Sequence, residues 1–295
     1  MGRRKKPARG NYRGTTLRLL RLALILMVIL AAAGFFALRQ YEAAVTFHPV
    51  RYLEGPGWKL PADAEDVWIS TAQGEHLHGW FARAAQQTVH QTIIYFHGNS
   101  GNITNVGWIG SAFAARGFDV LLIDYRGYGR SEGEVTDERG INADADAAYD
   151  YLVNERGVNP QQLVLIGQSL GMTAAADLAS RRACRALVLE SGPSSASDMA
   201  RVMLPWAPRW LSGLARNRFE SARKLASVHC PVLITHGSND NTIPVEQGRA
   251  LYNAANEPKR LIVVEGAGHD VAGFAGDRYL DSVAGFIRGT SDARL

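Results

Sequence analysis

Short apolar runs alternate with helix-like segments along most of the chain, and this alternation restricts its fold more than any other feature. Six apolar runs have the length of buried strands, at 92–97, 119–124, 163–167, 186–190, 232–236 and 260–265. Helical patterns separate most of them, at about 105–116, 140–155, 170–182, 245–255 and 275–289. Two earlier strand candidates, 66–71 and 77–83, flank Gln73-Gly74 and predict a hairpin. The pattern therefore predicts an α/β fold with one doubly wound, mostly parallel sheet.

The first 39 residues differ from the rest in charge and hydropathy. They hold nine of the 32 Lys and Arg and no acidic residue, which leaves 23 basic side chains against 28 acidic ones elsewhere. As a helix, the uncharged run 22–38 would extend about 25 Å, the low end of the length that spans a bilayer. We therefore predict a basic N-terminal segment over 1–21, a transmembrane anchor over 22–38, a linker over 39–65 and a folded domain over 66–295.

Two other interpretations of the apolar run remain open. A signal peptide cleaved near Ala31-Ala32-Ala33 would share the basic start. A buried helix of the folded domain would be amphipathic, whereas this run is apolar all round. For an anchor, the basic residues ahead of the span predict a cytoplasmic N-terminus and place the folded domain on the far side, periplasmic or extracellular.

The folded part predicts no nucleic-acid partner, because its mild negative charge lacks the basic footprint that such binding requires. Cys184 and Cys230 match neither a disulfide framework nor a metal-ligand spacing, and no motif calls for a cofactor. We expect two free thiols. Both cysteines precede strands predicted to be neighbours, so a disulfide between them is compatible with an exported domain.

The connection between the strands 186–190 and 232–236 is much longer than the others. We interpret 192–230 as a lid-like insertion that could form the wall of a substrate pocket. It contains the apolar residues Leu204, Trp206, Trp210 and Leu211. The alternative is that its tryptophans simply pack the insertion onto the core.

The motif Gly-x-Ser-x-Gly occurs twice, around Ser169 and around Ser131. An apolar strand candidate runs directly into Ser169, and a segment rich in small helix formers follows it. This is the strand–turn–helix context that a nucleophile elbow requires. Ser131 lies in a polar loop with no strand ahead of it, so we predict Ser169 as the nucleophile.

A serine nucleophile needs a base, and the base needs an acid that orients it. His269 follows the last predicted strand on a loop of small residues, and Asp240 follows the strand before it. The resulting chain order Ser–Asp–His is the order expected on this architecture. We therefore predict His269 as the base and Asp240 as the acid, with Glu190 as the reserve candidate for the acid. His236 also ends a strand and is the weaker candidate for the base.

The oxyanion of an acyl-transfer intermediate needs two backbone donors. We predict the N–H of Leu170, directly after the nucleophile, and the N–H of Asn99, in the loop that follows the strand 92–97.

The sequence resembles the α/β-hydrolase superfamily, and within it the membrane-anchored serine hydrolases with HGN and DYRGYG signatures. These signatures correspond to His97-Gly98-Asn99 and to the segment 124–133 in this chain. The similarity covers about residues 65–288. It implies an eight-stranded sheet, catalytic roles at Ser169, Asp240 and His269, and hydrolysis of ester, thioester or related acyl bonds without a cofactor.

We accordingly expect a serine hydrolase acting on a small-molecule acyl substrate, which the apolar insertion suggests could be lipid-like. Peptidase and acyltransferase activity are alternatives on the same fold. A catalytically silent, membrane-tethered interaction module is an alternative of a different class. No feature of the sequence indicates an oligomeric state.

Overall fold

The structure, a computed structural model, describes residues 12–52, 55, 58–85, 91–206, 208, 210, 213 and 215–289. The first 11 residues of the predicted basic segment lie outside this range. The chain divides into two compact units, Met1–Ala44 and Val45–Leu295.

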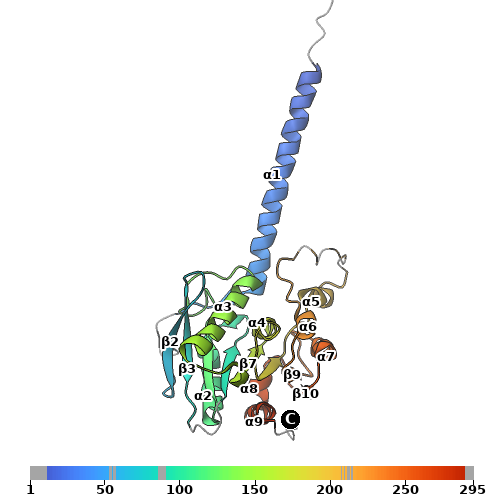
Figure 1. The fold of residues 1–295 in the computed structure, drawn as a ribbon. Coiled ribbons are helices and arrows are strands. Elements are labelled where there is room, and N and C mark those ends of the chain that lie inside the picture. Colours follow the sequence, from blue (N-terminus) through green and yellow to red (C-terminus); the bar gives the residue numbers. More distant parts are fainter. Residues whose placement is uncertain are drawn as a thin grey trace, which may run out of the picture. The chain divides into compact units, whose positions relative to one another are not determined.

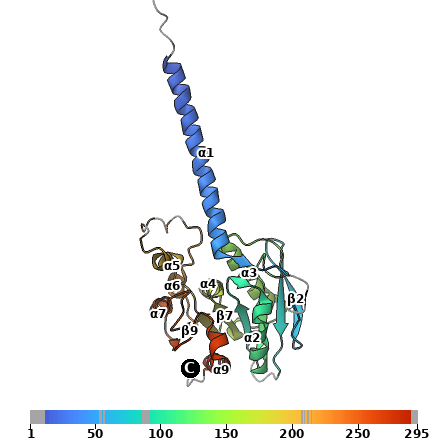
Figure 2. The same ribbon diagram turned by 180° about the vertical axis from the view of Figure 1, so that it is seen from behind.

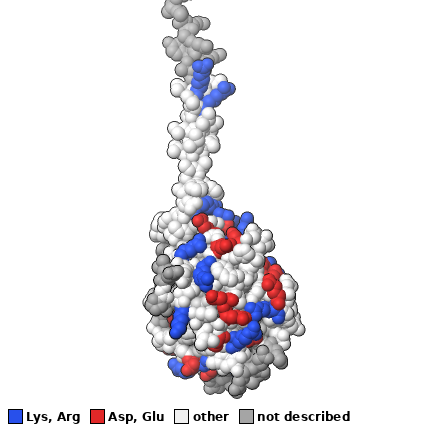
Figure 3. All heavy atoms as spheres, turned by 90° about the vertical axis from the view of Figure 1, so that its left-hand side faces the viewer, with Lys and Arg blue, Asp and Glu red and all other residues white. Residues whose placement is uncertain are grey.

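The helix α1 (Tyr12–Thr46) contains the whole apolar run (Figure 1). Its described part, Thr16–Thr46, is long and apolar enough to cross a membrane. Figure 3 shows an uncharged length of this helix, in white, bounded by charged side chains. The predicted linker over 39–65 is wrong at its start, since residues 39–46 continue the helix. No proline interrupts them before Pro49, and Arg39 forms an ion pair with Glu42 one turn later, at 2.9 Å.

The second unit is built on an eight-stranded sheet, as the family resemblance implied. Its strands lie in the order β10-β9-β8-β7-β4-β6-β3-β2. The pairs β2–β3 and β3–β6 are antiparallel, and the other pairs are parallel. The strands are β2 (Ala64–Ser70), β3 (His76–Ala82), β4 (Thr92–Phe96), β6 (Asp119–Ile123), β7 (Leu163–Gln168), β8 (Ala186–Glu190), β9 (Val232–Gly237) and β10 (Lys259–Val264).

A second, two-stranded sheet was not predicted. It pairs β1 (His48–Pro49) in parallel with β5 (Ser100–Gly101). The segment that leaves α1 is thereby attached to the loop after β4. It is part of the folded unit rather than part of a linker.

Helices cover both faces of the main sheet, as expected for a doubly wound fold (Figures 1 and 2). On one face α2 contacts α9, and on the other the contacts run from α3 through α4 and α6 to α7. The helices are α2 (Ile103–Ala115), α3 (Glu138–Asp150) with a π-helical turn over Tyr151–Glu155, the 3-10 turn Pro160–Gln162, α4 (Leu170–Ala179), α5 (Ala196–Met203), α6 (Ser221–Leu225), α7 (Val245–Ala254), α8 (Val271–Ala275) and α9 (Asp277–Arg288). The helix predicted over 275–289 corresponds to α9. It begins only after Gly276, whose φ of 56° is incompatible with a right-handed helix and separates α9 from α8.

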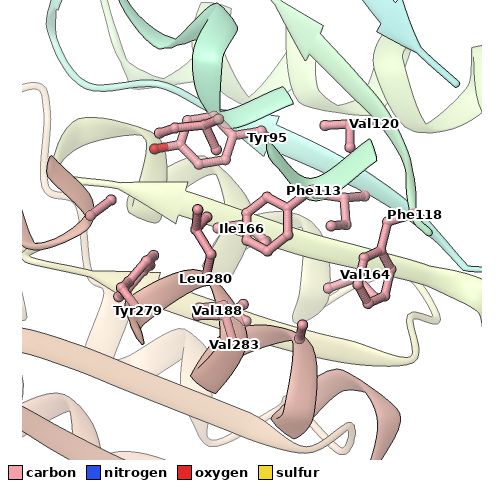
Figure 4. Close-up of a cluster of buried hydrophobic side chains, with 14 of the residues drawn as sticks. Tyr95, Phe113, Phe118, Val120, Val164, Ile166, Val188, Tyr279, Leu280 and Val283 are labelled. Carbon is pink, nitrogen blue, oxygen red and sulfur yellow. The ribbon is translucent and has the colours of Figure 1, made fainter. Parts of the chain in front are cut away.

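The core beneath α2 and α9 follows from the two-residue period of the strands. Alternate strand residues point to this face and pack against helical side chains (Figure 4). Strand residues of this cluster include Tyr95, Val120, Val164, Ile166 and Val188, and they meet Phe113, Tyr279, Leu280 and Val283 of the helices. The other strand residues are buried on the opposite face, which explains why these strands read as continuous apolar runs.

Candidate active site

Ser169 lies at a sharp turn between β7 and α4. Its backbone has φ 52° and ψ −117°, a conformation that residues with a side chain rarely adopt. Glycines on both sides make the turn possible: a Cβ on Gly171 would lie 2.1 Å from the carbonyl oxygen of Phe96, and one on Gly167 would lie 2.5 Å from that of Gly171. The sequence therefore places the Ser169 side chain at the carboxyl edge of the sheet with α4 packed tightly behind it.

The imidazole of His269 joins Ser169 to Asp240. Its Nε2 lies 3.0 Å from the Ser169 hydroxyl, and its Nδ1 lies 2.8 Å from a carboxylate oxygen of Asp240. The Asp240 side chain is fully buried, whereas 29% of the His269 side chain is exposed. The structure thus brings the three predicted side chains into one hydrogen-bonded chain, from loops after β7, β9 and β10.

The turn after β9 fixes the Asp240 carboxylate. One oxygen accepts the N–H groups of Thr242 and Ile243, at 2.8 and 2.9 Å. Burial alone would raise the pKa of Asp240, but hydrogen bonding with His236 and His269 and from the Ile243 N–H lowers it well below its usual value. The carboxylate is therefore ionised and aligned for the imidazole.

His236 does not compete for the role of base. Its Nε2 donates to the carbonyl of Ile243 at 2.8 Å and lies 3.4 Å from Asp240. The ring is fully buried. Its contacts stabilise the loop that carries Asp240.

The two predicted oxyanion donors lie on either side of the Ser169 turn. Leu170 is the first residue of α4, so its N–H is one of the groups that a helix leaves without a partner inside the helix. Gly98 packs against the serine, since a Cβ on it would lie 3.6 Å from the Ser169 Cβ. Asn99 follows directly, which places the loop after β4 beside the serine side chain.

Two tyrosines of the DYRGYG segment hold this loop, a role that the sequence analysis missed. The Tyr125 hydroxyl donates to the carbonyl of His97, and the Tyr128 hydroxyl donates to that of Asn99, both at 2.9 Å. The N–H of His48 also donates to the Asn99 carbonyl, at 3.0 Å. The sequence does contain a sign of this role, because a solvent-exposed glycine-rich turn has no need of two tyrosines.

Asp124, at the start of the same segment, is buried under the loop. One of its oxygens accepts the N–H of Ile103 at the start of α2, at 2.9 Å. The rings of His78 and His97 lie 3.6 and 3.7 Å from the carboxylate, and burial lowers the pKa of His97. Gly129 packs so closely that a Cβ there would overlap the Asp124 carboxylate. The contacts of Asp124 therefore join β3, the loop after β4 and α2 beneath the site.

Ser131, the serine of the second Gly-x-Ser-x-Gly motif, is completely buried. Its hydroxyl donates to the carbonyl of Asp124 at 2.6 Å and accepts the N–H of His78 at 2.8 Å. These bonds connect the segment 124–133 to β3.

Glu190, the reserve acid, ends β8 next to the elbow. Its carbonyl accepts the N–H of Ser169 at 2.8 Å, and its carboxyl group accepts that of Ala272 in α8 at 3.3 Å. Burial raises the pKa of Glu190 to about 7. Its carboxyl group is thus attached to the helix after His269, whereas Asp240 bonds the imidazole directly.

The insertion after β8 is apolar on its exposed surface. Trp206 and Trp210 are 78% and 67% exposed, and Met203 is 72% exposed. The alternative that the two tryptophans pack the insertion onto the core is therefore wrong. Leu211 lies outside the described residues.

Within the described residues, no group of three or more His, Cys, Asp or Glu could hold a metal ion. The chemistry available at the Ser169 turn is that of a hydroxyl, an imidazole, a carboxylate and main-chain N–H groups.

The sequence matches the family described as alpha/beta hydrolase fold over residues 91–230. It is 33% identical to uncharacterized protein YfhR of Salmonella typhi, over 95% of this chain and 98% of that protein. It is also 33% identical to alpha/beta hydrolase domain-containing protein 17C of Mus musculus, over 76% of this chain and 68% of that protein. Its fold is similar to that of the Pyrococcus furiosus esterase Pf2001, with a TM-score of 0.66, 23% identity and coverage of 82% of this chain and 98% of that one. The chain belongs to the α/β-hydrolase superfamily.

Proposed function

We propose that this protein is a serine hydrolase that cleaves carboxylic ester, thioester or related acyl bonds. The observation that carries the proposal is the position of the His269 imidazole, hydrogen-bonded to the Ser169 hydroxyl on one side and to the Asp240 carboxylate on the other. This arrangement can remove the hydroxyl proton as the oxygen attacks a carbonyl carbon.

In the proposed mechanism, Ser169 Oγ forms a bond to the acyl carbon while its proton moves to Nε2 of His269. Asp240 keeps the proton on Nδ1, so that Nε2 is free to accept, and it stabilises the imidazolium that forms. The imidazolium then protonates the departing alcohol or thiol, which leaves an acyl group on Ser169. A water molecule, deprotonated by His269, hydrolyses this acyl-enzyme and restores the serine.

The negative oxygen of each tetrahedral intermediate would be bound by the N–H groups of Leu170 and Asn99. Donors of this kind are effective when they are fixed in advance, because they need not reorganise as charge develops. The hydrogen bonds from Tyr128 and His48 to the Asn99 carbonyl support such a fixed loop.

Acyl substrates with an apolar chain fit the surface of the insertion best. Leu204, Trp206 and Trp210 are exposed there, in the connection that leaves the carboxyl end of β8. Exposed aromatic and aliphatic side chains in a cluster favour contact with apolar ligands or lipid. We therefore include lipid-like esters and thioesters in the proposed substrate class.

We further propose that α1 anchors the protein as a single span, with its apolar run over 22–38 in the bilayer. The basic residues before the run favour a cytoplasmic N-terminus and a catalytic domain on the other side. Protease treatment of spheroplasts from a bacterial host should digest this domain without lysis, and carbonate extraction should leave it in the membrane. Protection until lysis would contradict the orientation, and release of a soluble form would contradict the anchor.

The proposed nucleophile is tested with a fluorophosphonate probe, which reacts with activated serines. The purified wild-type protein should be labelled at Ser169, and Ser169→Ala should abolish labelling and lower kcat by about 10⁶ if the three residues act as a unit. The matched control is Ser131→Ala, which removes the serine of the other motif and should keep most of the activity. An unlabelled wild-type protein, or a folded Ser131→Ala variant without activity, would overturn the proposal.

The acyl preference is measured separately, with esters and thioesters of increasing chain length. A kcat/KM that rises with chain length supports the apolar substrate class. A preference for acetyl esters over long chains would restrict the protein to small acyl groups.

A further inference from the structure

Cys184 and Cys230 lie close together at the amino ends of the strands, whereas Ser169 lies at the carboxyl ends. Cys184 is two residues before β8, and Cys230 is two residues before β9. These strands are parallel neighbours, with Leu187 paired to Val232. Their register alone brings the two cysteines together, although they are 46 positions apart in the sequence, and the two Sγ atoms lie 3.1 Å from each other.

The two sulfur atoms differ in their surroundings. Cys184 is buried, while Cys230 is partly exposed. A hydrogen bond between the thiols lowers the pKa of Cys230, and the same bond together with burial raises the pKa of Cys184. Because the thiolate is the reactive form, Cys230 is the group that would attack first, and Cys184 is the group held ready behind it.

A surface hollow of about 490 Å³ gives access to this pair. It is lined by both cysteines and by residues that precede β7, β8 and β9, namely Gln161, Arg185 and Pro231. Arg181 and Arg182 also line it, and their guanidinium groups form ion pairs with Asp146, Asp177 and Asp150. The hollow therefore lies at the amino ends of the strands, on the side of the sheet opposite Ser169, where a small disulfide can reach the two thiols.

We propose that Cys184 and Cys230 are a thiol–disulfide exchange site, which is oxidised to an intramolecular disulfide by a small or protein-borne disulfide. The Cys230 thiolate attacks one sulfur of the donor, forms a mixed disulfide and releases one thiolate. Cys184 then loses its proton, attacks the Cys230 sulfur and displaces the second thiolate. Two protein thiols and one donor disulfide thus become one protein disulfide and two donor thiols.

The bridge would close the chain around the insertion. The residues between the two cysteines comprise β8 and the insertion, which contains α5 and α6. A disulfide between the two ends of this segment restricts the conformations of the unfolded chain and thereby stabilises the folded state. It would leave the Ser169 turn unchanged, because that turn lies at the opposite edge of the sheet.

The test uses the full-length protein in detergent. The reduced protein is incubated with glutathione disulfide, denatured, and treated with a maleimide–polyethylene glycol that shifts the gel mobility once per free thiol. We expect two shifts before oxidation and none after it, without covalent dimers, and recovery of both shifts on reduction. The oxidised protein should melt about 5–15 °C above the reduced one.

The matched variants are Cys184→Ser and Cys230→Ser. In Cys184→Ser, glutathione disulfide should leave a stable mixed disulfide on Cys230, because no second thiol displaces it. Cys230→Ser should react far more slowly, because its remaining thiol is buried. Neither variant should show a redox-dependent melting temperature.

If both thiols of the wild-type protein stay free after treatment with glutathione disulfide, the proposal is overturned. A persistent glutathione adduct or an intermolecular dimer would overturn it as well. The thiol count is independent of hydrolase activity, so its outcome stands whether or not Ser169 is the nucleophile.

Discussion

The hydroxyl of Tyr128 donates a hydrogen bond to the main-chain carbonyl of Asn99, over a distance of 2.9 Å. The bond connects the loop after β6 to the loop after β4, which packs against Ser169. Tyr125 makes the same kind of bond to His97, two residues earlier in that loop. A peptide plane that is held by its carbonyl cannot rotate freely. The two planes held in this way lie on either side of the plane that contains the Asn99 N–H, so the direction of that N–H is restricted from both sides.

This relationship predicts that Tyr128 positions the proposed oxyanion loop. Tyr128→Phe should lower kcat about 5- to 20-fold while KM changes less than about two-fold, a smaller loss than the 10²–10³ seen when an oxyanion donor is deleted. The matched control is Tyr149→Phe, which removes a hydroxyl bonded to the carbonyl of Ala183, away from the site. Steady-state kinetics give kcat and KM for both variants. An equal loss of kcat in Tyr128→Phe and Tyr149→Phe would contradict the positioning role of Tyr128.

The second prediction concerns the carboxylate that orients the imidazole. Asp240→Asn should lower kcat by up to about 10⁴, because an amide cannot hold the proton on Nδ1 of His269. The folded state should survive, since the amide oxygen can still accept the N–H groups of Thr242 and Ile243. Circular dichroism checks the fold, and hydrolysis of a model ester gives kcat.

Glu190→Gln is the control for this prediction and should keep near-normal kcat. The variant preserves an acceptor for the Ala272 N–H while removing the alternative acid. If Asp240→Asn were nearly normal and Glu190→Gln inactive, the acid role would move to Glu190.

The strands could be predicted because they are apolar over their whole length. The prediction for 186–190 coincides with β8, and that for 163–167 is one residue shorter than β7. Strands buried on both faces give continuous apolar runs that end abruptly at the loops. The positions of Ser169, Asp240 and His269 follow from the same fact, because each lies in the turn or loop after one of these runs.

The support of the site could not be predicted in the same way. The bonds from Tyr125 and Tyr128 join a side chain to a main-chain carbonyl across 28 and 29 positions. Main-chain acceptors are present at every residue, so such contacts leave no periodic pattern. The pairing of β1 with β5 involves only two residues on each side, which is too short for any strand signal.

The third prediction tests the close packing behind the elbow. Gly171→Ala would place a Cβ 2.1 Å from the main-chain oxygen of Phe96, and both contacting groups are held in the sheet and helix. We expect a loss of about 3 kcal/mol or more in the free energy of unfolding, typical of severe overpacking. Gly213→Ala is the control, since a Cβ there meets no atom within 4 Å. Denaturant unfolding of both variants measures the difference, and equal stability would show that the elbow can relax.

The fourth prediction concerns pH and Glu190. Burial raises the pKa of its carboxyl group from 4.5 to about 7, the negative charge of Asp270 adds to the rise, and the N–H of Ala272 opposes it. A raised pKa means that the folded state holds the proton more tightly than the unfolded state. The stabilisation is therefore complete below about pH 4.5 and is lost as the pH rises through about 7. At pH 8 the ionised, buried carboxylate should cost the wild-type protein on the order of 3 kcal/mol relative to a neutral group.

Glu190→Gln removes this titration while keeping the shape of the side chain. Relative to the wild-type protein, the variant should therefore gain stability between about pH 4.5 and pH 7, and the difference should level off at higher pH. The difference between the two proteins isolates Glu190, because Asp144, whose pKa burial raises to about 6, titrates in both. Urea unfolding at a series of pH values gives the two curves. Parallel curves over this range would mean that Glu190 is already ionised in the folded protein at pH 5, with a cation or solvent compensating its charge.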